Sequence, residues 1–228
     1  MTAALSPRRQ RTRERKVDAI VNIAMSLVAD QGLEGLTLHK IAAAMDWVPG
    51  TLYRYFSSKD VLLAELQARV LIEYGEAQHA QLSRYAPEES LLALLLMAQH
   101  YVNWFQKRPG HHALIAMGLA HPKALLSETT GQPVLRAAMG VLTQANEVFV
   151  QSAQQGFLQQ GNSIDRTLAY WASVQGVLQM HKLARFAPDT FNVDRVLLET
   201  IRTLLLGWGA KASQLEQTMT TIAQGTSP

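Results

Sequence analysis

Apolar residues recur every three or four positions along most of the chain, which is the spacing of one face of an α-helix. Val17, Ile20, Val21 and Ala24 form the first such face, and Gly32 follows where a left-handed turn would end that helix. No run of alternating apolar and polar residues has the pattern of a β-strand. The pattern therefore predicts an all-α protein.

Residues 37–59 read TLHKIAAAMDWVPGTLYRYFSSK and predict two short helices around a tight turn. Thr37 has the side chain of a helix N-cap, Asp46 and Trp47 form the turn, and Pro49 suits the first turn of the second helix. Leu52 and Phe56 would then point into the core. Two such helices form a helix-turn-helix, whose second helix enters the major groove of DNA.

The later part of the chain has longer, more apolar helical segments separated by Pro and Gly. We expect an N-terminal three-helix helix-turn-helix domain over residues 1–60, joined to a C-terminal bundle of about six helices over residues 61–228. Apolar faces on the last two helices would either pair with a second copy of the chain or close the monomer's own core. The helices of the bundle are expected at Glu88–Lys107, Gly110–Leu119, Pro133–Gln160, Ser163–Arg185 and Val193–Trp208, with a further short helix or frayed chain after Gly209.

Composition narrows the choice of function. The 228 residues are 48% hydrophobic, enough for a substantial core. The absence of cysteine excludes disulfides and thiolate metal sites, and we expect a cytoplasmic protein. The most apolar run, Leu91–Ala98, is too short to cross a membrane. Residues 1–59 hold nine Lys and Arg against five acidic residues, a positive excess that favours a polyanionic partner.

The segment from Lys16 to Leu66 resembles the DNA-binding domain of the TetR family of transcriptional regulators. The resemblance is carried by the run GTLYRYFSSKDVLLAEL, and by Gly32, Gly35, Thr37, Ile41 and Ala42 before it. It implies a homodimer whose C-terminal domain binds a small-molecule effector. On this resemblance, effector binding shifts the fourth helix and changes the separation of the two recognition helices, so that a palindromic operator is released.

The resemblance also implies a set of DNA contacts. Arg54 would reach either a phosphate or a guanine edge, and Pro49 and Gly50 would make only apolar contacts with base edges. The residues expected to bind phosphates are Thr37, Thr51, Tyr53, Tyr55 and Lys59.

The turn departs from the family pattern. Asp46 stands where the family has a turn glycine, and we expect it to adopt the left-handed conformation. Val48 replaces a capping serine and cannot cap the second helix. Because the start of that helix offers no side-chain donors, we expect the basic arm Arg8–Lys16 to contribute to DNA binding through arginines such as Arg11 and Arg13.

Residues that would line the effector cavity come from the helices that surround it in the family. A mostly apolar pocket with a few polar groups suits a lipophilic or aromatic compound. Aromatic residues at helical spacing are also ordinary core, so each position has both interpretations. The candidates are His100, Tyr101, Trp104, Phe105, Met117, Phe149, Trp171 and Gln175.

Two other classes of function remain as alternatives. His100, His111, His112 and His121 would suit a metal-dependent enzyme or metal sensor, but no HExxH motif or suitably spaced carboxylate accompanies them. A DNA-binding protein without an effector is the second alternative. We expect no enzyme activity, cofactor, metal or membrane partner. We expect the protein to repress transcription, with activation as the alternative.

Overall fold

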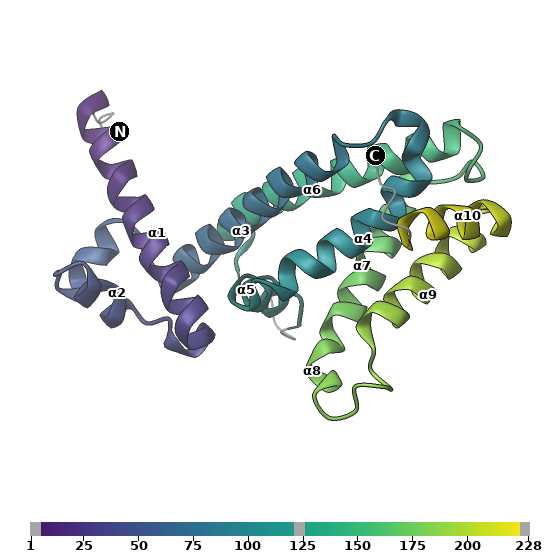
Figure 1. Ribbon diagram of the computed structural model, residues 1–228. Coiled ribbons are helices and arrows are strands. Elements are labelled where there is room, and N and C mark those ends of the chain that lie inside the picture. The colour runs from purple at the N-terminus through teal and green to yellow at the C-terminus, as the bar shows by residue number, and fades with distance from the viewer. Residues whose placement is uncertain (1–5, 121–125, 224–228) are drawn as a thin grey trace. The chain divides into compact units, whose positions relative to one another are not determined.

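The computed structural model describes residues 6–120 and 126–223, and every regular element in these ranges is helical. The chain divides into two compact units. The first comprises Met1–Leu71 and Arg108–Ala138, and the second Ile72–Lys107 and Met139–Pro228. The division falls inside two long helices, α3 (Lys59–Leu82) and α6 (Glu128–Gln154), which are labelled in Figure 1. The expected boundary at residue 60 concerns function and stays a prediction.

The first unit holds the N-terminal helices and α5. Its core contains fully buried Ile20, Val21, Ile41 and Leu66. These apolar side chains come from different helices, so their burial holds the small bundle together. The elements that belong wholly to this unit are α1 (Pro7–Gly35), α2 (Leu38–Ala44), the 3-10 helix η1 (Pro49–Arg54) and α5 (Pro109–Ala120).

The second unit is a helical bundle in which α7 and α9 run side by side (Figure 1). Its core is rich in aromatic residues, with Tyr74, Phe105 and Phe149 almost completely buried. Its remaining elements are the 3-10 helix η2 (Pro87–Glu89), α4 (Ser90–Gln106), α7 (Ser163–Gln179), α8 (His181–Ala184), α9 (Val193–Gly207) and α10 (Ala212–Ala223). No helix among the described residues is long and apolar enough to span a bilayer.

The basic arm is helical rather than extended. Helix α1 begins at Pro7, so the whole run Arg8–Lys16 forms its first turns. Proline favours this position because its fixed φ angle is helical and its missing N–H would be unpaired there. Gly32 adopts a left-handed φ of 70° and interrupts the helix close to its end, which confirms the expected turn at this residue.

The helix-turn-helix has the predicted caps and turn. Thr37 Oγ1 accepts a hydrogen bond from the amide of Lys40 at 3.2 Å, and Asp46 adopts a left-handed φ of 55°. Val48 makes no side-chain cap. The second helix differs from the expected form, because η1 is a short 3-10 helix. Its side chains therefore align every third residue, which pairs Thr51 with Arg54.

Two predicted helices in the second half of the chain have wrong boundaries. Helix α6 starts at Glu128, five residues before Pro133, because proline near a helix start loses only one backbone hydrogen bond. It ends at Gln154, and Gly156 follows with a left-handed φ of 75°, a helix-ending signal that the apolar pattern obscured. The predicted helix Ser163–Arg185 ends at Gln179 and is followed by the separate short helix α8.

The first part of α3 is fixed to its neighbours in the first unit. Gln67 Nε2 donates a buried hydrogen bond of 2.8 Å to the Leu114 carbonyl of α5, and Arg69 pairs with Asp18 of α1 at 2.9 Å. Helix α5 also packs tightly on α1, because a Cβ atom at Gly110 would lie 3.2 Å from the backbone N and Cα of Ala29. The glycine at position 110 allows the backbones of α5 and α1 to approach this closely.

We therefore expect Gly110→Ala to destabilise the protein by about 1–3 kcal/mol, because the backbone of Ala29 cannot move aside as a side chain can. Urea unfolding measures the change. The matched control is Gly140→Ala in α6, where no atom lies within 4 Å of the new methyl group, and which should be neutral or stabilising by up to about 1 kcal/mol. Equal effects of the two substitutions would contradict the packing described here.

Candidate nucleic-acid interface and small-molecule cavity

The residues that the sequence assigned to DNA contacts all belong to the first unit. Leu52 and Phe56 are buried, which confirms that they point into the core. Tyr53, Arg54 and Lys59 are exposed, and Thr37, Thr51 and Tyr55 are half-buried. The Thr37 hydroxyl, although it accepts the capping bond, still has a proton to donate. The exposed set offers hydroxyl and cationic donors, which suit phosphate oxygens.

An aromatic pair joins the turn to the end of η1. The rings of Trp47 and Tyr55 stack with centroids 5.5 Å apart. Two cations of α1 cover this pair: Lys16 Nζ lies 5.6 Å from the Trp47 ring centre, and the Arg13 guanidinium 6.0 Å from that of Tyr55. Arg13 also donates a 3.4 Å hydrogen bond to the Tyr55 carbonyl. The pair therefore connects the basic start of α1 to the end of η1, the proposed recognition element, a role that the sequence did not indicate for Trp47.

The helical form of the arm sorts its cations into two stripes. Positions three, four and seven apart share one face of a helix. Arg13 and Lys16 lie on the stripe that leans on the aromatic pair, together with Arg9. Arg8, Arg11 and Arg15 form a second exposed stripe, rotated by about 120° from the first. Arg11 and Arg13, expected to act alike, therefore have different surroundings.

A small cavity of about 30 Å³ lies in the core of the second unit. Four helices line it, so its shape depends on how they pack. Its wall is formed by Tyr74 and Gln78 of α3, Met97 and Tyr101 of α4, Val141, Leu142 and Ala145 of α6, and Thr167, Tyr170, Trp171 and Val174 of α7.

Hydrogen bonds connect the helices around this cavity. The Tyr74 hydroxyl donates to Gln78 Oε1 at 2.9 Å, and Gln78 Nε2 donates to the Val141 carbonyl of α6 at 3.0 Å. The Tyr101 hydroxyl of α4 donates to Gln175 Oε1 of α7 at 2.7 Å. Tyr170 of α7 donates to the Leu94 carbonyl of α4. Because these bonds are buried, breaking one without replacing it is costly.

The tyrosines around the cavity are held in their neutral form. Burial raises the pKa of Tyr74, Tyr101 and Tyr170, because the phenolate would lose its hydration. Tyr74 also packs edge-on against Tyr101 and Trp104, with ring centroids 5.2 and 5.3 Å away. The hydroxyls therefore remain donors throughout the physiological range.

Part of the first unit matches a known protein family in sequence. Residues 20–66 match the sequence model of the family described as bacterial regulatory proteins, tetR family. This part of the chain is therefore similar to the N-terminal domain of TetR-family regulators. No curated protein matches the chain.

Solved structures show that the TetR-like fold extends over most of the chain. RolR in complex with resorcinol is 17% identical, with a TM-score of 0.67 over 92% of this chain and 95% of that one. SmeT, the repressor of the SmeDEF multidrug efflux pump of Stenotrophomonas maltophilia, is 18% identical, with a TM-score of 0.60 over 86% and 91%. FadR of Bacillus subtilis, solved with stearoyl-CoA, is 16% identical, with a TM-score of 0.62 over 81% and 97%.

The predicted effector residues fall into three groups in this TetR-like structure. Tyr101 and Trp171 line the cavity. Gln175 does not line it but accepts a hydrogen bond from the Tyr101 hydroxyl. The second group, His100, Trp104, Phe105 and Phe149, belongs to the same unit without lining the cavity. Met117 lies in the first unit. Sequence analysis missed Tyr74 and Gln78, although their spacing of four residues on one helix face is a signal for a shared environment.

The histidine candidates do not form a recognisable metal centre. Within residues 6–120 and 126–223, no three His, Asp or Glu side chains lie close enough together to hold an ion. His100 lies in the second unit, and His111 and His112 lie in the first. His121 lies outside the described residues.

The aromatic pair leads to a prediction about DNA binding. Stacked aromatic pairs contribute about 0.5–1.5 kcal/mol, so Trp47→Ala should weaken DNA binding by roughly two- to tenfold by loosening Tyr55. Trp47→Phe keeps a ring and should retain most of the affinity. Fluorescence anisotropy with labelled duplex measures both, and thermal unfolding checks that the fold is intact. Wild-type affinity in Trp47→Ala would contradict a positioning role.

The buried tyrosines lead to a prediction about pH. Their folded pKa values exceed the unfolded value of about 10, so the unfolded chain loses protons first. Stability from these groups is complete below pH 10 and falls above it, by up to about 1.4 kcal/mol per pH unit for each tyrosine. Urea unfolding between pH 8 and 11 measures the slope, which should be shallower in Tyr101→Phe. An identical slope in that variant would contradict the assignment for Tyr101.

Proposed function

We propose that this protein is a ligand-responsive DNA-binding regulator. In this proposal a homodimer, acting as a repressor in the cytoplasm, binds a palindromic operator and releases it when a small, largely apolar effector occupies the cavity of the second unit. The chain acts by binding rather than by catalysis. Activation is the alternative sign of regulation.

Helix α3 is the single observation that carries this proposal. Its first residue, Lys59, belongs to the proposed DNA surface, and its later residues Tyr74 and Gln78 line the cavity. All of these side chains are on one uninterrupted helix of 24 residues. A change in the cavity that moves this helix therefore also moves Lys59 and η1, which directly precedes the helix.

The proposed DNA contacts are made by side chains that are exposed or half-buried in the first unit. Lys59 and the hydroxyl groups of Thr37, Thr51, Tyr53 and Tyr55 bind phosphates, which fixes the position of the domain on the duplex. Arg54 binds a phosphate or a guanine edge, and Pro49 and Gly50 contact base edges without side-chain donors. Arg11 acts from the outer stripe of α1, while Arg13 acts through Tyr55 as well as by its charge.

We propose that α7 and α9 form the dimer interface. The predicted apolar faces of these helices divide in the structure: Gln175, Leu178, Leu197, Ile201 and Leu205 are buried within the monomer's own core. Ile164, Leu168 and Ala172 of α7 are exposed, and so is Leu198 of α9.

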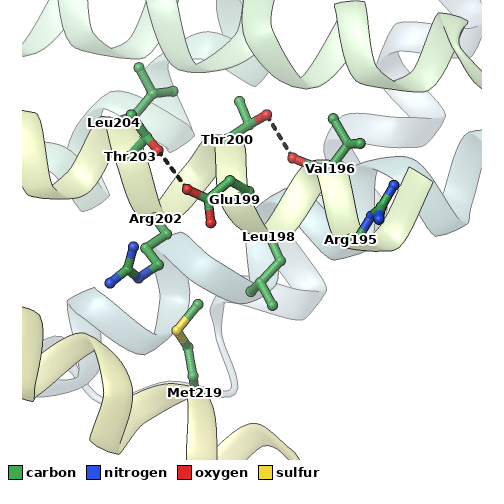
Figure 2. Close-up of a pocket in the computed structure, with 9 residues that line it drawn as sticks. All are labelled: Arg195, Val196, Leu198, Glu199, Thr200, Arg202, Thr203, Leu204 and Met219. Atoms are coloured by element: carbon green, nitrogen blue, oxygen red, sulfur yellow. Dashed lines mark hydrogen bonds between the residues drawn. The ribbon is translucent and has the colours of Figure 1, made fainter. Parts of the chain in front are cut away.

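The outer face of α9 borders a groove that a partner copy would cover. Figure 2 shows Leu198 of α9 pointing towards Met219 of α10 across this groove, which has a volume of about 720 Å³. Glu199, Arg195 and Arg202 surround the apolar residues, so both signs of charge are present for a self-complementary interface.

Selection of bound sequences from random duplex DNA tests the proposal directly. A dimer should select a palindrome whose half-sites are centred about one helical turn, 34 to 36 Å, apart. A compound library then tests release of the selected duplex. A monomeric, non-palindromic site, or no selected sequence at all, would contradict the proposal.

The DNA contacts also predict how binding depends on salt. Each phosphate contact releases counterions, so Lys59→Ala and Arg11→Ala should each lower the slope of log affinity against log salt by about 0.9 per site. Affinity measured between 50 and 200 mM salt gives the slope. Lys182→Ala, on exposed α8 of the second unit, is the matched control and should leave it unchanged. An unchanged slope in Lys59→Ala would show that Lys59 does not contact a phosphate.

A further inference from the structure

The wall of the cavity contains no charge. Among the described residues that line it, none is Lys, Arg, His, Asp or Glu. An ion placed there would lose its hydration without a partner of opposite charge, which costs several kcal/mol or more. Carboxylates and the phosphates of an acyl-thioester are therefore poor occupants of this space.

The wall offers aromatic faces and edges instead. Tyr74, Tyr101, Tyr170 and Trp171 together supply four rings from three different helices. Tyr74 and Tyr101 meet at an interplanar angle of 81°, an arrangement that a further flat ring can extend by edge or face contacts. The volume of about 30 Å³ is far below the 300–1,000 Å³ of pockets for drug-sized molecules. A small ring system requires the least displacement of these helices.

One polar group beside the cavity lacks a hydrogen-bond partner. Gln175 is only 7% exposed, and its Oε1 accepts the Tyr101 bond, but its Nε2 has no partner in the part of the chain that the structure describes. If the amide were turned over, the oxygen would be the unpaired atom. Gln175 directly follows Val174 and lies one turn after Trp171, both of which line the cavity. A hydroxyl group, which both donates and accepts, can satisfy the amide in either orientation.

We infer that the effector is a small uncharged aromatic compound of one or two rings that carries a hydroxyl group. Its ring inserts among the tyrosine and tryptophan side chains, and its hydroxyl joins the hydrogen bond between Tyr101 and Gln175. This inference rests on the proposed function, because it assumes that the cavity of the second unit receives the effector.

Three compounds of similar shape test the inference on the full-length protein. 2-Naphthol carries the hydroxyl, naphthalene lacks it, and 2-naphthoate replaces it with a charge. By titration calorimetry, 2-naphthol should bind about tenfold more tightly than naphthalene, the gain expected of one hydrogen bond to a buried partner. 2-Naphthoate and stearoyl-CoA should bind at least 100-fold more weakly than 2-naphthol.

Variants locate the hydroxyl group. Tyr101→Phe and Gln175→Met each remove one member of the pair while keeping an apolar side chain of similar size. Both should bind naphthalene as the wild type does and lose the preference for 2-naphthol, a result that a general loss of stability would not give. Gln217→Leu, on the exposed surface of α10, should keep the preference.

Several results would overturn the inference. They are tighter binding of 2-naphthoate or stearoyl-CoA than of 2-naphthol, an undiminished hydroxyl preference in both variants, and no binding of 2-naphthol at 1 mM. If a charged compound releases the selected DNA, the inference fails and the proposed function stands. If no compound of any class releases the DNA, the ligand-responsive part of the proposed function fails as well.

Discussion

The continuity of helix α3 is the constraint on which the account depends. The helix runs without interruption from Lys59 to Leu82, a length of about 36 Å. One end follows the recognition element, and the other contributes Tyr74 and Gln78 to the cavity wall. The bonds from Gln67 to α5 and from Arg69 to Asp18 fix the first part of the helix, and the Gln78 bond to α6 fixes its later part.

The cavity is surrounded by interactions that the proposed effector would have to replace. Tyr74 bonds to Gln78 within the wall, and Tyr101 of the wall bonds to Gln175 beside it, and both hydrogen bonds are buried. An effector shifts the equilibrium only by the difference between its affinities for the closed and open arrangements. Ring contacts together with one well-placed hydroxyl provide such a difference, because they replace the ring contacts and the hydrogen bond that are lost when the wall opens.

The structure of the proposed DNA surface was predictable from sequence because its determinants are local. The Thr37 cap, the left-handed Asp46 and the burial of Leu52 and Phe56 each depend on a few neighbouring residues, and each was found as expected. The 3-10 form of η1 was not predicted, since the same residues suit either kind of helix. The helical state of the arm was likewise missed, because a run of arginines has no apolar periodicity.

The cavity was predictable only in part, because its shape depends on which helices meet. The family resemblance placed Tyr101 and Trp171 among the cavity candidates but gave no reason to select Tyr74, whose neighbours come from distant parts of the chain. The same limitation explains Met117, which belongs to the other unit. It also explains α9, of which Leu197, Ile201 and Leu205 are buried in the monomer's own core.

The most direct test of coupling through α3 is a distance between the two recognition elements of a dimer. Because the chain has no cysteine, Ser57→Cys on the exposed surface accepts a single spin label. Pulsed electron resonance then compares the DNA-bound dimer with the dimer bound to a releasing compound. The account predicts one narrow distance with DNA and a shifted or broader distribution with the compound. Identical distributions in the two states would contradict it.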